Sequence, residues 1–425
     1  MLLKFQDFAR CFVGSERAAA PAVHTTAVPS VPVPAPATLP DNDDLIREIL
    51  LRLPPLPSSL PRASLVCKRW RRLVSDPGFL CRFREHHRTP PLLGYFFSDC
   101  RGPVFTPTLR PPDRVPSARF SLPPQHAGDR LFFLGCRHGL ALLINRRRLE
   151  AIVWDPITSC QATVAYPPEF TTDNGAHCCR GAVLGGGGDG NALVLVPGSD
   201  DDHLRLRPFK VILIRTDIDH GHTSVFMCVY ESGTGKWGKT MSTTIPSYPY
   251  NLPDVLIGNV LLCGFLHWPN GGILQLDLDR QSLGIIKTPE GLHCLDSSLL
   301  RVVQTQDGGL GLAVLLNLSF QLWGRKADSD GVAGWVLQTS VEVNKLLLLP
   351  PSTDNNLSAR ILGYDEDSNA IHLATSTGVF AIQLESMKFK ELFNVYPIDS
   401  YYPCHPYASF YTAGWGKEHN TTEIY

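Results

Sequence analysis

The segment DNDDLIREILLRLPPLPSSLPRASLVCKRWRRLV, residues 41–74, decides how the chain begins to fold. Apolar residues recur in its first part at the spacing of one helix face, and acidic residues precede them, as suits a helix N-terminus. The apolar residues of this predicted helix are Leu45, Ile46, Ile49, Leu50 and Leu53. Pro54-Pro55 ends the helix, because proline cannot continue it.

A second predicted helix starts near Ser58 or Ser59 and ends at Pro77-Gly78. Its apolar residues share one face and are Leu65, Val66, Trp70, Leu73 and Val74. A third short helix, around Phe79 to Phe83, ends before Pro90-Pro91. Each helix is too short and one-sided to be stable alone. The sequence therefore predicts a small three-helix domain over residues 39–90, with apolar surface left for a partner.

The chain before this domain has a different composition. Residues 18–38 are almost entirely Ala, Pro, Val and Thr, which favours an extended, solvated linker. Charged residues such as Lys4, Asp7 and Arg10 interrupt the apolar start, so no signal-peptide core forms. We expect residues 1–38 to be a disordered N-terminal segment, and we expect no membrane span.

After Pro91 the pattern changes to short apolar runs separated by Gly, Pro, Asn and Asp, typical of strands and turns. Several stretches repeat a strand, a polar turn and a second strand, with turns near residues 157, 234, 280 and 386 and a further one near Gly331. Radial arrays of blades leave such a repeat. The fold class predicted is α+β multidomain: a small helical domain, then an all-β, propeller-like domain over residues 91–425 with about six to eight blades.

Composition excludes several classes of function. The formal net charge is −1 and charged residues make up 19%, so nothing attracts the whole chain to nucleic acid or to an anionic membrane. The 12 cysteines include no C-x-x-C pair, which removes the usual zinc and redox spacings. We expect reduced thiols in a soluble cytoplasmic or nuclear protein, and no cofactor.

One motif imitates a nucleotide site. Gly233, Gly238, Lys239 and Thr240 satisfy the P-loop pattern G-x-x-x-x-G-K-[ST]. A P-loop needs a helix after it, but the next residues are rich in Ser, Thr, Tyr and Pro, and bulky Trp237 lies inside the loop. We interpret the match as chance, with a hairpin turn here and Trp237 packed between blades.

Two other clusters favour plain structural interpretations. The basic residues around Trp70 fit a solvated helix face better than a nucleic-acid patch, since Asp76 and Glu85 interrupt them. His177-Cys178-Cys179 and His220-Gly221-His222 lack the spacing of zinc ligands and fit loops. No G-x-S-x-G or H-E-x-x-H pattern occurs, so the sequence gives no reason to expect catalysis.

The helical segment resembles an F-box. The matching features are Leu39-Pro40, the Ile49-Leu50 helix, Leu53-Pro54, and Val66-Cys67-Lys68-x-Trp70, in the family's order and spacing. Pro57-Ser58-Ser59-Leu60 stands where many F-boxes have an acidic-Leu element. The β region, including VLIGNVLLCGFLHW (255–268) and ILGYDEDSNAIHLATSTGVFAIQLESMKFKEL (361–392), resembles the associated domain of plant F-box proteins. The resemblance covers roughly residues 39–415.

This resemblance implies a non-catalytic substrate-recognition subunit of an SCF-type cullin-RING ubiquitin ligase. The F-box would dock on a Skp-type adaptor, and the β domain would bind a target protein. The residues that it places in the adaptor-binding module, as core or interface, are Leu39, Pro40, Leu45, Ile49, Leu53, Val66, Cys67 and Trp70. Among the apolar residues of the two helices, Ile49 and Leu65 are expected mainly in the core. Leu39 and Pro40, which precede the first helix, are expected at the interface.

Two other hypotheses remain open at this stage. A propeller enzyme would carry converging His, Asp or Tyr side chains at the mouth of a central channel. An F-box protein could also act as a scaffold outside the ligase. Binding to a Skp-type adaptor separates the first alternative from the leading hypothesis, and a ubiquitination assay separates the second.

Overall fold

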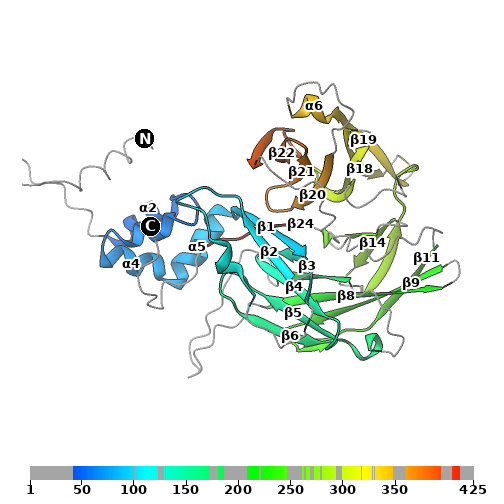
Figure 1. Ribbon diagram of the computed structural model, residues 1–425, viewed down its shortest axis with the longest axis horizontal. Helices are drawn as coiled ribbons and strands as arrows, with labels where there is room; N and C mark the ends of the chain where they lie inside the picture. The colour runs from blue at the N-terminus through cyan, green and yellow to red at the C-terminus, as the bar shows by residue number, and fades with distance from the viewer. Residues whose placement is uncertain are drawn as a thin grey trace, which may run out of the picture. The chain divides into compact units, whose positions relative to one another are not determined.

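The chain is described here from a computed structural model, in which helices come first along the sequence and strands follow (Figure 1). The described residues are 42–99, 102–122, 129, 131–171, 180–185, 208–219, 222–246, 261–262, 265–268, 272–277, 280–292, 299–316, 318–327, 329, 331–347, 359–393 and 404–411. Residues Asp43–Tyr425 group as one compact unit.

The helical part contains four short helices between residues 42 and 88. They are α2 Asp43–Leu51, α3 Ser59–Ser64, α4 Lys68–Ser75 and α5 Pro77–His87. The sequence predicts three, because the apolar spacing continues without a break through the second predicted helix. Cys67 interrupts it: its backbone is extended, and its thiol accepts a hydrogen bond from the Trp70 N–H at 3.5 Å, which starts a new helix. Asp76 begins α5 in the same way, accepting from the Phe79 N–H at 2.9 Å.

Five antiparallel sheets follow one another along the chain, each formed by four or five consecutive strands. Their strands are β3 Leu131–Arg137, β4 Leu140–Asn145, β5 Glu150–Trp154 and β6 Gln161–Ala165; β7 Arg180–Gly185, β8 Phe209–Asp219, β9 His222–Glu231, β10 Lys236–Trp237 and β11 Met241–Pro246; β12 Leu261–Leu262, β13 Phe265–Trp268, β14 Gly272–Asp277 and β15 Ser282–Ile286; β16 Leu300–Gln304, β17 Leu310–Leu316, β18 Ser319–Ala327 and β19 Ala333–Glu342; β20 Ala359–Asp365, β21 Ala370–Thr375, β22 Gly378–Gln383 and β23 Phe389–Phe393. The short helices η1 Ser117–Phe120, η2 Pro168–Phe170 and α6 Val343–Leu346 lie between strands.

A sixth sheet joins the two ends of the β region. It consists of β2 Gly102–Pro107, β1 Leu92–Asp99 and β24 Cys404–Ala408, and Phe96 on β1 lies opposite His405 on β24. Strand β24 also contacts β20 of the last meander and β3 of the first. The sheets thus contact one another in a closed, propeller-like ring. Five complete meanders are slightly fewer than the six to eight blades expected, and the three-stranded sheet closes the ring.

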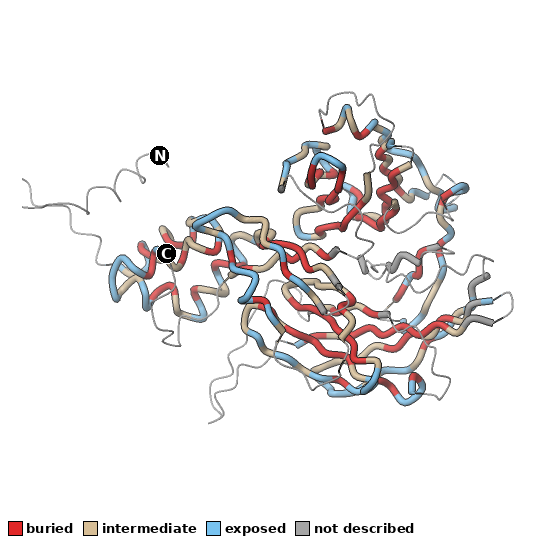
Figure 2. Tube along the Cα trace, viewed as in Figure 1, coloured by how far each residue is buried: buried red, intermediate tan, exposed pale blue. Residues whose placement is uncertain are grey.

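The hydrophobic core lies between neighbouring sheets (Figure 2). Phe96, Trp154 and Tyr407 pack between the closing sheet and the first meander. Tyr95 and Val379 pack between the last meander and the closing sheet. Inner strands such as β4 are buried along their whole length, which explains their continuous apolar sequence. Every sheet therefore depends on both of its neighbours.

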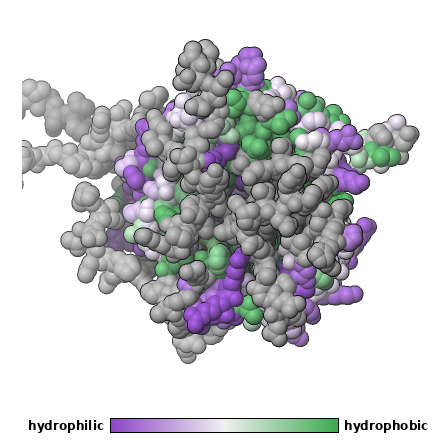
Figure 3. Space-filling view, turned by 45° about the vertical axis from the view of Figure 1, so that its right-hand side comes forward, coloured by the Kyte–Doolittle hydropathy of each residue, from purple (hydrophilic) through white to green (hydrophobic). Residues whose placement is uncertain are grey.

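Hydrophobic and hydrophilic residues are mixed on the molecular surface. On the face drawn in Figure 3, hydrophobic residues form separate patches among hydrophilic ones, which gather along the right-hand edge. Among the described residues, no helix is long and apolar enough to cross a membrane.

The turns predicted from the sequence repeat all occupy one position in their sheets. Those near residues 157, 234, 280, 331 and 386 each join the third strand of a meander to the fourth. Among the described residues, each turn contains a residue with a positive φ angle, and these residues are Ser159, Gly235, Gln281, Gly331 and Met387. Only two are glycines, although glycine adopts this conformation most easily. This explains why the repeat is degenerate in sequence although regular in structure.

One ion pair connects the first and last meanders beside the closing strand. The guanidinium of Arg137, at the end of β3, donates to Glu366 Oε2 from Nη2 at 2.7 Å and from Nε at 2.9 Å. Both side chains line a cavity of about 50 Å³ together with Tyr407 of β24. Burial raises the pKa of Glu366 to about 7, although Arg137 opposes that shift. Asp365 and Asp367 raise the pKa further.

The raised pKa predicts a pH-dependent stability. The folded chain holds the Glu366 proton more tightly than the unfolded chain, so this stabilisation is complete below the ordinary value of 4.5 and is lost as pH rises through about 7. We expect Glu366→Gln to remove this loss, so that the free energies of unfolding of the two proteins diverge by about 1–3 kcal/mol between acidic and neutral pH. Urea titrations across that range measure the difference. Glu385→Gln, at an exposed carboxylate, is the matched control, and parallel pH profiles for wild type and Glu366→Gln would contradict the assignment.

Candidate functional site

The four short helices share a core of their own. Each contributes buried apolar side chains, and the buried members are Ile46, Leu50, Leu51, Leu60, Ala63, Leu73, Val74, Phe79 and Phe83. Leu53, Trp70 and Leu80 pack against this core while remaining partly exposed. Because no helix is longer than three turns, the helices hold one another in place. The four helices therefore form one packed unit.

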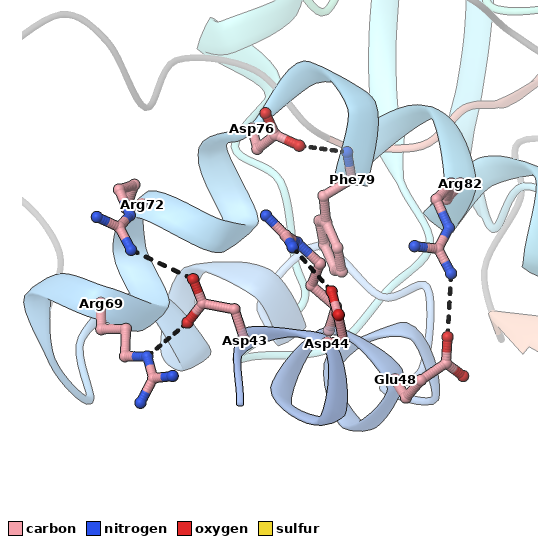
Figure 4. A network of polar contacts seen from close by, with 9 residues as sticks. Asp43, Asp44, Glu48, Arg69, Arg72, Asp76, Phe79 and Arg82 are labelled. Carbon is pink, nitrogen blue, oxygen red and sulfur yellow. Dashed lines mark hydrogen bonds and ion pairs between the residues drawn. The ribbon is translucent and has the colours of Figure 1, made fainter. Parts of the chain in front are cut away.

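Ion pairs connect α2 to α4 and α5 (Figure 4). Asp43 accepts from Arg69 at 2.6 Å and from Arg72 at 3.3 Å, and the hydrogen bond from Arg69 holds the Asp43 pKa below its ordinary value. Glu48 accepts from Arg82 at 3.0 Å. Three members of the basic cluster thus face acidic residues of α2, which agrees with their interpretation as a helix surface.

Large apolar side chains remain exposed on this module. Leu45 is 46% exposed, Leu65 75% and Val66 58%. The Asp43–Arg69 bond joins the start of α2, which includes Leu45, to the start of α4, which Leu65 and Val66 precede. We call Leu45, Leu65 and Val66 the exposed apolar face. Single exposed leucines are common, but three on so small a module are typical of a binding surface.

The residues expected in the adaptor-binding module fall into three groups. Leu45, Val66 and Cys67 are exposed, and Cys67 also caps α4. Ile49 is half-buried, and Leu53 and Trp70 are half-buried against the helical core. Leu39 and Pro40 lie outside the described residues. Whether any of these side chains contacts an adaptor stays a prediction.

Sequence reasoning misplaced one residue of this surface. Leu65 was expected mainly in the core, on the same face as Leu73, and it is instead the most exposed of the large apolar residues of the module. Helix α3 ends at Ser64, so Leu65 lies at the break before α4 and not inside a continuous helix. Leu56, 37% exposed between α2 and α3, was also missed. Cys67, which caps the N-terminus of α4, is the residue in the sequence that marks the break between α3 and α4.

The helical core includes one residue from the far end of the described chain. Phe410, two residues after β24, is 5% exposed and lies edge-on to Phe83, with ring centroids 6.5 Å apart. A second contact joins the helical module to the β region: the Ser58 N–H donates to Asp113, which follows β2, at 3.0 Å. The closing strand of the ring therefore leads directly into the core of the helical module.

The P-loop-like segment forms a hairpin, as expected. Gly233 lies in the turn between β9 and β10, where the Gly235 N–H donates to the Glu231 carbonyl at 2.8 Å. The Trp237 indole N–H donates to the Ala165 carbonyl at 2.9 Å, in the neighbouring sheet, so Trp237 does pack between blades. No helix follows the turn. Gly238, Lys239 and Thr240 continue into β11, and their expected lack of a nucleotide stays a prediction.

The other candidate clusters are only partly described. His177, Cys178 and Cys179 lie outside the described residues, as do His220 and Gly221. Across the part of the chain that the structure describes, no group of three or more His, Cys, Asp or Glu residues could hold a metal ion.

Comparisons with known proteins agree with the helical geometry. Residues 42–82 match the F-box domain. An F-box protein of Arabidopsis thaliana, At3g16210, is 27% identical over 216 residues, and the alignment covers 49% of this chain and 49% of that protein. The matched region thus spans about half the length of this curated relative.

Similarities to solved structures are weak. The extracellular domain of a hybrid two-component system from B. thetaiotaomicron has 12% identity and a TM-score of 0.30, covering 70% of this chain and 33% of that one. Dipeptidyl peptidase 4 of Porphyromonas gingivalis has 10% identity and a TM-score of 0.28, covering 64% and 40%. At these TM-scores the similarities say nothing about the function of this chain.

The fold and the site together define a protein with a short helical binding module followed by a β-propeller-like domain. Residues 42–82 of the helical module match the F-box domain, and the Arabidopsis thaliana relative carries the name of an F-box protein.

The buried contact of Phe410 predicts that the F-box needs the end of the β region. Phe410→Ala removes a large side chain from a small core, which typically costs about 3–5 kcal/mol. We expect the amide hydrogens of α2 to α5 to exchange faster in this variant, while those of the β sheets change little. Hydrogen-exchange mass spectrometry measures both parts at once. Phe389→Ala, on β23 and packed against a different core, is the control, and unchanged exchange in α2 to α5 would remove Phe410 from the F-box core.

Proposed function

We propose that this chain is a substrate-recognition subunit of an SCF-type cullin-RING ubiquitin ligase. F-box domains in general serve this role, and residues 42–82 match one. In this proposal the F-box domain, residues 39–90, docks on a Skp-type adaptor, and the β domain, residues 91–425, binds the target protein. The observation that carries the proposal is the exposed apolar face of Leu45, Leu65 and Val66 on a module whose core is otherwise filled.

The exposed apolar face has the chemistry of a helix-docking surface. Burying a Leu or Val side chain contributes about 1.5–3 kcal/mol, so three such residues can supply much of the free energy of association. Charged residues beside them, including Asp44 and Lys68, stay in water and would form the rim of an interface. Leu39 and Pro40, just before α2, would extend the same surface.

The β domain is proposed to act by binding and not by chemistry. Its closed ring offers a stable frame on which turns can present a specific surface to a target. We assign the chain no catalytic step, no nucleic-acid partner and no membrane partner, and we place it in the cytoplasm or nucleus. An adaptor role requires that the β domain recognise a specific target protein.

The proposal predicts a selective loss of adaptor binding in Leu45→Asp. Leu45 is nearly half exposed, so the substitution should disturb the F-box core little, but it would bury an unpaired charge once the adaptor docks. We expect an unchanged melting temperature and at least about tenfold weaker binding, a loss of about 1.4 kcal/mol or more. Leu39→Asp should act in the same way. Calorimetric titration with a purified Skp-type adaptor measures the affinity.

The control introduces the same charge at an exposed apolar residue of the β region. Val336→Asp, on β19, changes an apolar residue that is 49% exposed and should leave adaptor binding unchanged. Trp70→Ala is a poorer probe, because Trp70 packs against the helical core and its loss would confuse unfolding with a lost contact. If both Leu45→Asp and Leu39→Asp bind with wild-type affinity, the apolar face is not the docking site.

A further inference from the structure

A pocket of about 150 Å³ lies against the outer strands of the second meander. Three lysines line it, Lys210, Lys236 and Lys239, together with Glu231, Trp237 and Met241. Gln281, in a turn of the third meander, completes the wall. The pocket thus includes Lys239 of the P-loop-like segment, which the F-box function leaves unexplained.

A β-bulge positions Lys239 in this pocket. Trp237 lies opposite Tyr230, and Met241 lies opposite Met227. The outer strand therefore advances four residues while β9 advances three, so one extra residue lies between β10 and β11. The Gly238 N–H still donates to the Val229 carbonyl at 2.8 Å, which fixes the start of the bulge. Bulges commonly redirect side chains at functional sites.

The charge of the pocket is positive. Lys210 pairs with Glu231 at 2.7 Å, so these two groups offset each other. Lys236 and Lys239 are exposed, and among the described residues neither forms an ion pair. A hollow that carries two uncompensated ammonium groups concentrates the field and attracts an anion. Each ammonium can also donate a charge-assisted hydrogen bond to a carboxylate or phosphate oxygen.

The floor of the pocket is apolar. Met241 is buried and Val229 packs in the same hydrophobic cluster, and both residues line the pocket. Trp237 packs on the other face of the sheet, where its indole N–H bonds to Ala165 and its ring centroid lies 5.4 Å from that of Tyr230. Lysines on an edge strand can also serve only to discourage pairing with another chain. That role does not require a bulge, an apolar floor or a third lysine from β8, and all three are present here.

We propose that this pocket binds an anionic side chain of the target protein, with the anionic head on Lys236 and Lys239 and an apolar stem against Val229 and Met241. The inference rests on the proposed function, since it names the chemistry that the β domain would recognise in its target. A phosphorylated side chain and a glutamate share this chemistry, and the experiment distinguishes them.

The test uses the full chain, with short peptides as probes. Their central residue is phosphoserine, phosphotyrosine, glutamate, serine or tyrosine, and the flanking residues are randomised. We expect binding to be stronger for the anionic centres than for serine and tyrosine. The peptide that binds best is then titrated against wild type and against Lys236→Gln/Lys239→Gln. We expect about tenfold weaker binding or more in the double variant, because two charge-assisted contacts are lost. Lys326→Gln, at an exposed lysine of β18, should bind as wild type.

Two results would overturn the inference. One is equal binding of anionic and neutral centres, and the other is an affinity that the double variant does not change. Unchanged melting temperatures confirm that the variants are folded, as expected for exposed lysines. Leu45→Asp separates the two proposals, because it should bind the peptide as wild type does. Loss of adaptor binding with intact peptide binding concerns the F-box alone, and a failed peptide test with intact adaptor binding rejects only the pocket.

Discussion

The pairing of β1 with β24 is the constraint on which the rest of the structure depends. Each meander buries its faces against two neighbours, so the first and last would each expose an apolar face if the ring were open. The closing strand contacts β20 of the last meander and β3 of the first, so it helps to cover both faces. Tyr407 shows the effect at one residue, since this side chain of the closing strand packs with Phe96 of the strand that begins the β region.

The same strand couples the β domain to the F-box. Arg137 and Glu366 meet beside β24, and Phe410 continues from it into the helical core. The change in sequence pattern at Pro90-Pro91 separates the helical module from the β region along the chain. In the fold, Phe410 from the end of the β region packs in the helical core. Phe410 therefore adds a residue of the β region to the buried core of the helical module.

Local features of the fold could be predicted from the sequence, and non-local ones could not. The hairpin turns follow from a strand-turn-strand pattern within a few residues, and the structure places all of them between third and fourth strands. The contact of Phe96 with His405 joins residues far apart in sequence, and no local pattern encodes it. The break before α4 was missed because Leu65 and Val66 continue the apolar spacing of a helix, while the cap that ends this continuity is a single cysteine. For the same reason Leu65 was assigned to the core although it is exposed.

The segment from Gly233 to Thr240 shows what a motif does and does not encode. Gly233, Gly238, Lys239 and Thr240 match a phosphate-binding pattern, yet a P-loop binds phosphate through backbone amides ahead of a helix. Here the backbone amides of Gly235 and Gly238 bond within the hairpin and the sheet, and the side chains of Lys236 and Lys239 stay exposed in the pocket. The near-neutral net charge of the whole chain does not reveal the local excess of positive charge in this pocket. Salt screens distant charges, so the nearby lysines set the local potential. Residue types can therefore suggest a binding site for an anion. Only the pairing of β9 with β10 and β11 determines whether backbone amides or lysine side chains would bind it.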